Sequence, residues 1–111
     1  MKLFAGLRKI REFERLQLTF FRTIIDFDIV VEIGYAEERG QPLTLKRLFL
    51  LNFSSRTTVR RKLAKLLEQG IVVRRKDSGD QRSALLLIAP STHKLLTRFG
   101  GTLTTISAQF E

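Results

Sequence analysis

Residues 44–82 read TLKRLFLLNFSSRTTVRRKLAKLLEQGIVVRRKDSGDQR, and this stretch decides the fold. Its apolar residues recur at helical spacing and predict a short helix over 45–51 and a longer one over 56–69, with a turn between them. The period then changes to that of strands, and residues 71–76 and 82–89 are predicted to form the two arms of a β-hairpin. The local pattern is therefore helix, turn, helix, hairpin.

The ends of the two predicted helices carry suitable residues. Thr44 and Ser55 have hydroxyl groups that can accept hydrogen bonds from the free backbone N–H groups at each helix start. Gly70 suits the end of the second helix because glycine adopts the left-handed backbone conformation without strain. The second helix has an apolar face (Val59, Leu63, Leu66 and Leu67) and carries basic residues largely on its other faces (Arg56, Arg60, Arg61 and Lys65).

The positive charge of the chain is concentrated in the same stretch. The 111 residues carry a net charge of +9, and the sequence pI is near 10.9. Residues 44–82 hold eleven basic and three acidic residues, a net charge of +8, so the remainder contributes only +1. A basic excess indicates a polyanionic partner, either nucleic acid or an acidic membrane surface, and its confinement to one motif favours nucleic acid.

The segments on either side of this motif are also predicted to be helical. Residues 7–17 form one apolar series and a second runs from 20 to 35, with either a continuation or a short break between them. A last helix is predicted to start at Pro90, which suits a first helical position. The pair Gly100-Gly101 lies within that helix and predicts a kink or a break there.

Four pieces of the sequence together resemble the MarR-type winged helix-turn-helix transcriptional regulators. They are LTLKRL at 43–48, SRTTVRR at 55–61, the helix end and first strand over 66–74, and two aspartates followed by an arginine over 77–82. The resemblance covers about residues 40–95 and implies dimeric regulators that bind double-stranded DNA, most often as repressors. The chain provides less helix outside the wing unit than that family usually has, so it corresponds to a short variant.

The predicted fold class is mainly α with a small β-hairpin wing. It is a winged helix-turn-helix whose terminal helices form a dimerisation region. We expect a single domain over 1–111, in which 1–39 supplies core and dimerisation helices, 40–89 the DNA-binding unit and 90–111 a C-terminal dimerisation helix.

In such a fold the helix over 56–69 enters the major groove, and the hairpin over 71–89 follows the adjacent backbone or minor groove. The three arginines of the helix are expected to distinguish DNA sequences through base contacts, while Lys46 and Lys65 are expected to contact phosphates. The predicted DNA-binding residues are Thr44, Lys46, Arg47, Ser55, Arg56, Thr57, Thr58, Arg60, Arg61, Lys65, Arg74, Arg75, Lys76 and Arg82.

The acidic residues of the wing are interpreted as structural. Asp77 and Asp80 are expected to shape the turn of the hairpin or to orient Arg82. The chain has no cysteine and only one histidine, His93, so no metal site and no cofactor are predicted. No combination of nucleophile, base and orienting group is visible, and we do not expect an enzyme.

Two apolar series outside the wing unit predict a homodimer. A single recognition helix reads few base pairs, so a two-fold pair of chains is needed for a longer operator. Apolar residues close to the two chain ends would be hard to cover in a monomer of this size. The predicted dimerisation residues are Leu3, Leu7, Ile10 and Phe13 at one end, and Phe99, Leu103, Ile106 and Phe110 at the other.

The sequence leaves two alternatives to sequence-specific binding of double-stranded DNA. The alternatives are a winged-helix module for protein–protein interaction and a nonspecific nucleic-acid-binding protein. No apolar run approaches the roughly 20 residues of a membrane span, so no membrane partner is expected. We expect a cytoplasmic, nucleoid-associated protein, and the sequence does not indicate whether a small-molecule effector exists.

Overall fold

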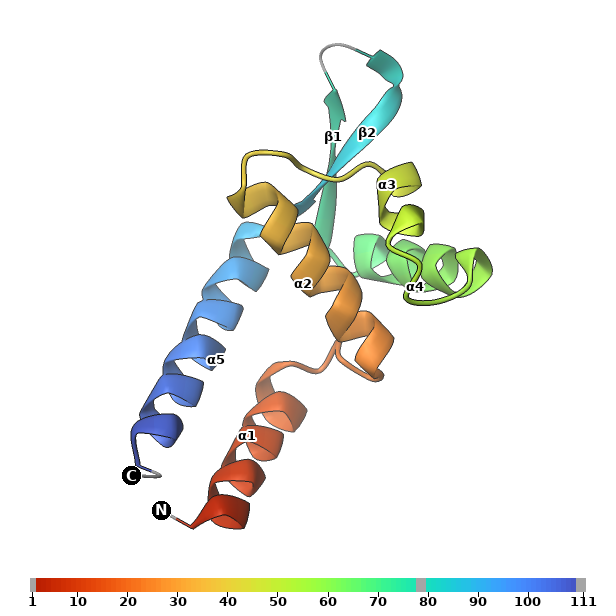
Figure 1. Cartoon of the computed structure of the whole chain (residues 1–111). Helices are drawn as coiled ribbons and strands as arrows, with labels where there is room; N and C mark the ends of the chain where they lie inside the picture. The colour runs from red at the N-terminus through yellow and green to blue at the C-terminus, as the bar shows by residue number, and fades with distance from the viewer. Residues whose placement is uncertain (1, 78–79, 110–111) are drawn as a thin grey trace.

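The computed structural model describes residues 2–77 and 80–109, and the side chains of all of these except 77 and 80–83. The fold is mainly helical with one two-stranded antiparallel hairpin, which confirms the predicted fold class (Figure 1). The elements are α1 (Leu3–Gln17), α2 (Ile24–Glu38), α3 (Leu45–Leu50), α4 (Arg56–Glu68), β1 (Val72–Asp77), β2 (Asp80–Ile88) and α5 (Pro90–Ala108).

The helix ends follow local rules that the sequence contains. The Thr44 hydroxyl accepts a hydrogen bond from the Arg47 N–H at 3.3 Å, and the Ser55 hydroxyl accepts one from the Thr58 N–H at 3.1 Å. Gly70, directly after α4, has a φ of 71°, in the left-handed region that favours glycine. These caps fix the start of α3 and both ends of α4, so the helix-turn-helix is specified largely by its own residues.

Helix α5 differs from the sequence prediction. It continues through Gly100-Gly101 without interruption, so the predicted break is wrong. Neither glycine adopts the left-handed conformation, and α5 packs along α1 over this region. The Thr104 hydroxyl donates to the Gly100 carbonyl oxygen at 2.9 Å, and Thr105 makes the same bond to Gly101 at 3.0 Å. Tertiary packing therefore outweighs the low helix propensity of two glycines.

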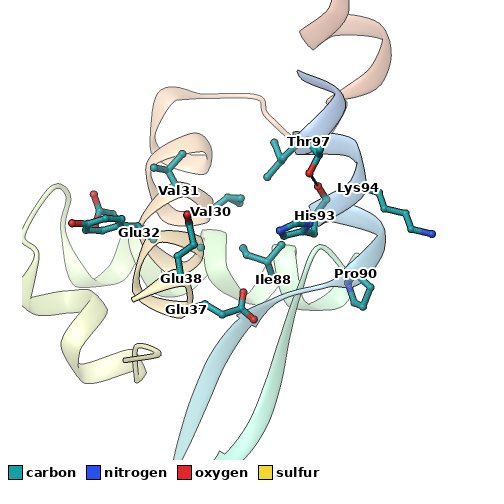
Figure 2. Close-up of a pocket in the computed structure, with 13 residues that line it drawn as sticks. Val30, Val31, Glu32, Glu37, Glu38, Ile88, Pro90, His93, Lys94 and Thr97 are labelled. Carbon is teal, nitrogen blue, oxygen red and sulfur yellow. Dashed lines mark hydrogen bonds between the residues drawn. The ribbon is translucent and has the colours of Figure 1, made fainter. Parts of the chain in front are cut away.

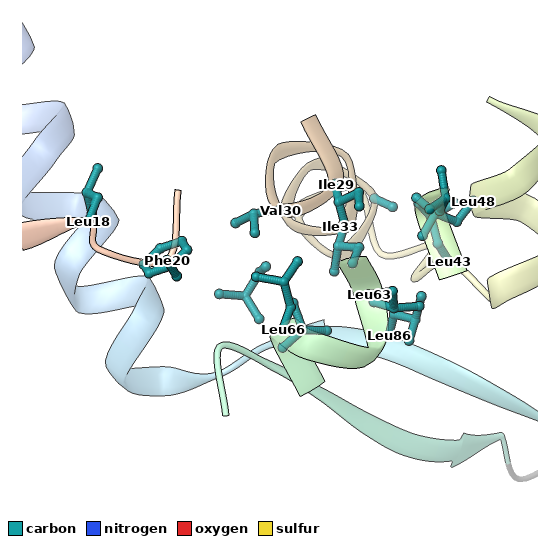
Figure 3. Packing of buried hydrophobic residues seen from close by; sticks show 14 of the residues in the cluster. Leu18, Phe20, Ile29, Val30, Ile33, Leu43, Leu48, Leu63, Leu66 and Leu86 are labelled. Atoms are coloured by element: carbon teal, nitrogen blue, oxygen red, sulfur yellow. The ribbon is translucent and has the colours of Figure 1, made fainter. Parts of the chain in front are cut away.

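The core lies where α2, α3 and α4 meet the base of the hairpin (Figure 3). Ile33 of α2 and Leu48 of α3 are completely buried, and Leu66 of α4 and Leu86 of β2 are nearly so. The backbone N–H of Leu86 also donates to the Leu43 carbonyl oxygen at 2.8 Å, which ties the hairpin to the segment before α3. Helix α4 and the hairpin thus share one packed base.

Helices α1 and α5 extend away from this base as an arm (Figure 1). They lie side by side and run in opposite directions, so the start of α1 and the end of α5 lie at the same, far end of the arm. The Phe13 and Phe99 rings pack across the pair with centroids 5.6 Å apart. The chain measures 51 × 26 × 23 Å and its radius of gyration is 15.6 Å, against about 13 Å for a compact chain of this length.

Among residues 2–77 and 80–109, no helix has the length and apolar character needed to cross a membrane.

Candidate nucleic-acid interface

The outer face of α4 is the centre of the candidate site. Val59, Leu63 and Leu66 anchor the helix in the core. The opposite face is formed by residues at spacings of four, three and four, and all of them are exposed: Thr57, Arg61, Ala64 and Glu68. The small side chain of Ala64 in this face allows the helix to approach another surface closely. The Thr57 hydroxyl and the Arg61 guanidinium lie on the same face.

One flank of α4 faces α3 and carries two of the predicted arginines. The guanidinium carbons of Arg56 and Arg60 lie 5.6 and 5.5 Å from the centroid of the Phe49 ring. Both distances are within the range of cation–π attraction. Both arginine side chains are exposed and Phe49 is half-buried, and the two guanidinium groups lie over its ring. Phe49 was not among the predicted site residues, because its apolar character fits a core position equally well.

The other flank of α4 is tied to α2 by a buried carboxylate. The Lys62 ammonium lies 3.3 Å from Asp26 Oδ1, although the two residues are 36 positions apart. Asp26 Oδ2 accepts hydrogen bonds from the backbone N–H groups of Arg22 at 3.1 Å and Thr23 at 2.8 Å. Asp26 therefore caps α2 and anchors α4 at the same time.

The pKa of Asp26 reflects these contacts. Burial raises the pKa, but hydrogen bonds from the Thr23 backbone, Lys62 and the Thr23 hydroxyl, together with the charge of Lys62, hold it below its ordinary value. Asp26 is thus ionised whenever the solution is near neutral. The pattern Thr23-x-x-Asp26 resembles a capping box and could have indicated the start of α2, but nothing local could indicate Lys62 as the partner.

The remaining predicted contact residues of the helix-turn-helix lie on α3, on a flank of α4 and at the starts of both helices. Lys46 and Arg47 are exposed in the first turn of α3, and Lys65 is exposed on α4. The hydroxyls of Thr44 and Ser55 are occupied as helix caps. The side chain of Thr58 is half-buried, and its hydroxyl accepts a hydrogen bond from Ser55 at 2.9 Å.

The wing extends the basic surface. β1 and β2 pair in register from Val72 opposite Ile88 to Lys76 opposite Ala84, and the register shifts after Lys76. Arg74, Arg75 and Lys76 are all exposed, so the first strand carries cations on both faces of the hairpin. The side chains of Asp77, Asp80 and Arg82 lie outside the described residues, and their predicted roles stay predictions.

The predicted dimerisation residues fall into two groups, those covered within the arm and those exposed on its surface. Phe99 and Ile106 are buried within the chain, and Phe13 packs on Phe99, so these residues serve the α1–α5 contact itself. Ile10 is half-buried, while Leu3, Leu7 and Leu103 are exposed. Sequence reasoning missed Phe4, which is 78 % exposed. Phe110 lies outside the described residues.

A separate cavity of about 930 Å³ lies between α2 and the start of α5 (Figure 2). Val30 and Val31 from α2 and Ile88 from the end of β2 give it apolar walls. His93 and Lys94 of α5 and Glu32, Glu37 and Glu38 of α2 also line it. In Figure 2 the His93 ring points toward α2, while the Lys94 side chain extends away from it. Such a lining has room for a small molecule and offers charges of both signs. In the part of the chain that the structure describes, no group of three or more histidine, cysteine or acidic residues is arranged to hold a metal ion.

Comparison with known proteins places this fold among solved regulators. No family model and no curated protein matches the chain. A transcriptional regulator from Thermotoga maritima is 23 % identical with a TM-score of 0.70, and the match covers 94 % of this chain and 74 % of that one. MepR of S. aureus, in a DNA complex, is 16 % identical with a TM-score of 0.69, covering 90 % and 80 %. A MarR variant from E. coli, complexed with operator DNA, is 15 % identical with a TM-score of 0.62, covering 95 % and 74 %.

These structural matches cover 90 to 95 % of this chain, so they include the arm as well as the helix-turn-helix. The chain has the winged-helix fold of MarR-type transcriptional regulators, and the resemblance predicted from residues 40–95 is confirmed at the level of the fold.

Proposed function

We propose that this chain is a transcription regulator that binds double-stranded DNA in a sequence-specific manner, as a homodimer. Helix α4 enters the major groove, and the β1–β2 wing follows the adjacent backbone or minor groove. The observation that carries the proposal is the outer face of α4, where Thr57, Arg61 and Ala64 stand exposed, with the exposed Arg60 on one flank and the exposed Lys65 on the other. An arginine can read guanine, a hydroxyl can bond to several bases, and alanine can contact a thymine methyl group.

The charge distribution supports DNA as the partner. Exposed cations lie on each element of the motif: Lys46 and Arg47 on α3, Lys65 on α4, and Arg74 to Lys76 on the wing. Phosphate contacts of this kind position a protein on the duplex, while base contacts select the sequence. A module for protein–protein interaction has no need of so many exposed cations on one motif, so DNA is favoured over that alternative.

The arm supports a dimer. The exposed Leu3, Phe4 and Leu7 of α1 lie on the same arm as the exposed Leu103 of α5. A second copy that covers these side chains would remove them from water, at about 1.5–3 kcal/mol for each side chain that becomes fully buried. Two DNA-binding units would then face half-sites about one helical turn apart. Repression by occupation of an operator on the nucleoid, in the cytoplasm, is the mode that the resemblance implies.

The proposal is tested by selection from a pool of random duplexes of about three helical turns. We expect the chain to enrich a common sequence and to bind it about 1,000-fold more tightly than a shuffled duplex. Arg61→Gln should lower this ratio about tenfold or more, because one base contact is lost in each half-site. Lys9→Gln, an exposed cation of α1, is the matched control and should keep the ratio.

Two other results would assign a different function. Equal affinity for selected and shuffled duplexes would indicate a nonspecific nucleic-acid-binding protein. Absence of binding to any duplex at low salt would favour the module for protein–protein interaction.

A further inference from the structure

The geometry beside α4 separates the roles of the three arginines. Resting on the proposed function, we infer that Phe49 is a positioning residue for DNA binding. Its ring holds Arg56 and Arg60 as a paired guanidinium site for a phosphate of the DNA backbone, and this leaves Arg61 as the arginine that reads bases. The sequence alone had placed all three arginines together as base-reading residues.

The first observation is the shared ring. Arg56 and Arg60 lie one turn apart on α4, and their guanidinium carbons are 5.6 and 5.5 Å from the same Phe49 centroid. Phe49 belongs to α3, so the contact joins the two helices of the DNA-binding motif. A long arginine side chain loses rotational freedom when it binds a ligand. Cations already held against a ring lose less of that freedom, which favours binding.

The second observation is the charge balance at this ring. Two like charges four residues apart on a helix repel each other. The ion pairs among the described side chains join Arg11 to Glu14 and Lys62 to Asp26, and neither of them involves Arg56 or Arg60. An anion with several acceptor oxygens would relieve the repulsion and satisfy donors of both guanidinium groups. A backbone phosphate has this chemistry, whereas a base edge is neutral.

The third observation is the direction of the side chains. Successive residues of a helix point about 100° apart, so Arg60 faces the α3 flank while Arg61 stands on the outer face. The major groove is about 12 Å wide, which is close to the diameter of a helix with its side chains. The outermost line of the helix therefore meets base edges, and its flanks meet the phosphate walls of the groove.

A double-mutant cycle tests the inference on the full chain. The probes are the duplex selected by the wild type and a shuffled duplex of the same length. Phe49→Leu removes the ring face and should weaken binding to both duplexes by the same factor, about fivefold. Phe49→Tyr keeps the ring face and should restore wild-type affinity. Arg56→Gln with Arg60→Gln should also weaken both duplexes equally and reduce the salt slope by about 1 for each half-site.

The decisive measurement is Phe49→Leu in the background that already lacks both arginines. We expect no further loss there, because Phe49 acts through the arginines. The matched control is Phe53→Leu, since Phe53 is also half-buried against the core and no cation–π pair of the described residues involves it. Its effect should be the same with and without the two arginines.

Three outcomes would overturn the inference. They are a Phe49→Leu loss that persists in full without the arginines, a failure of Phe49→Tyr to restore affinity, and a loss of discrimination in the double arginine variant. Phe49→Met provides the same cycle if the leucine variant does not fold. Failure of the wild type to bind any duplex would instead refute the proposed function, so the two results are distinguishable.

Discussion

Asp26 shows at the residue scale how one carboxylate holds two elements together. It is 6 % exposed, it caps α2 through the Thr23 N–H, and it pairs with Lys62 of α4. Its pKa lies below the ordinary value because these contacts outweigh the effect of burial. The orientation of α4 against α2 therefore depends on an ionised side chain that lies away from the outer face of α4.

We predict that Asp26→Asn destabilises the chain by about 2 kcal/mol at pH 7, since a cap is weakened and Lys62 loses its partner. A carboxylate with a lowered folded-state pKa contributes stability above its unfolded pKa, near 4, and loses this contribution as the pH falls through the folded-state value. The difference between wild type and variant should therefore shrink below about pH 4. Urea unfolding at several pH values measures it.

Asp28→Asn is the control for this prediction, because Asp28 lies on the same helix and is only half-buried. It should change stability by less than about 0.5 kcal/mol. A cost of Asp26→Asn that stays constant down to pH 3 would contradict the role of the ionised carboxylate.

At the scale of elements, glycine is required by the backbone conformation at one position of this chain and not at another. Gly40 follows α2 with a φ of 75°, and a side chain there would be strained even though a Cβ would meet nothing within 4 Å. Gly100 lies inside the continuous helix α5, and a Cβ there would also meet nothing within 4 Å. Backbone conformation alone distinguishes the two positions, since the surrounding space is equally open.

We therefore predict that Gly100→Ala stabilises the chain by about 0.5–1 kcal/mol and that Gly40→Ala destabilises it by about 1 kcal/mol. Alanine restricts the unfolded chain and suits a helix interior, but it is strained at a positive φ. Urea unfolding of both variants at one protein concentration provides the measurement, and each variant is the control for the other. A destabilising Gly100→Ala would indicate close contact with a second copy at this position.

At the scale of the whole molecule, the arm distinguishes this chain from a compact body of its length. It carries exposed apolar side chains at Leu3, Phe4, Leu7 and Leu103, far from the wing. The basic surface lies at the other end of the molecule, around α4 and the hairpin. Association through the arm would leave two basic surfaces free for one duplex.

We predict a mass of twice the 12.8 kDa chain by light scattering at micromolar concentration. Leu7→Glu combined with Leu103→Glu should give a folded monomer that binds the selected duplex at least tenfold more weakly, because charged groups cannot be buried in an apolar seam. Ile106 is unsuitable for this test, since it is buried within the chain. Leu50→Glu on α3 changes an exposed leucine outside the arm and should leave the dimer intact. A wild-type monomer that still binds tightly would refute the arrangement.

We also predict strong dependence of DNA affinity on salt, since phosphate contacts release bound counterions. Neutralisation of roughly six phosphates by each dimer gives a slope of log K against log salt of about −5. Fluorescence anisotropy with a labelled duplex between about 50 and 200 mM salt measures this slope. A slope near zero would contradict the assignment of the basic surface to DNA.

The sequence by itself determined the helix-turn-helix and the hairpin that follows it. Helical and strand periods gave α3, α4 and the hairpin, because alternation of apolar and polar residues depends only on backbone geometry. Thr44, Ser55 and Gly70 marked the helix ends, since a cap acts on backbone groups within a few residues. Such features are local in the chain and can be predicted locally.

The tertiary structure alone decided which side chains meet. An apolar period shows that a face is covered, but it does not say by which element. Phe99 and Ile106 were predicted to contact a second copy, whereas the structure buries them within the arm of the same chain. The pairing of Asp26 with Lys62, and of Phe49 with Arg56 and Arg60, joins residues of different helices. Contacts of this kind depend on how helices pack against one another, and the arrangement of helices in space is not encoded in any one local stretch.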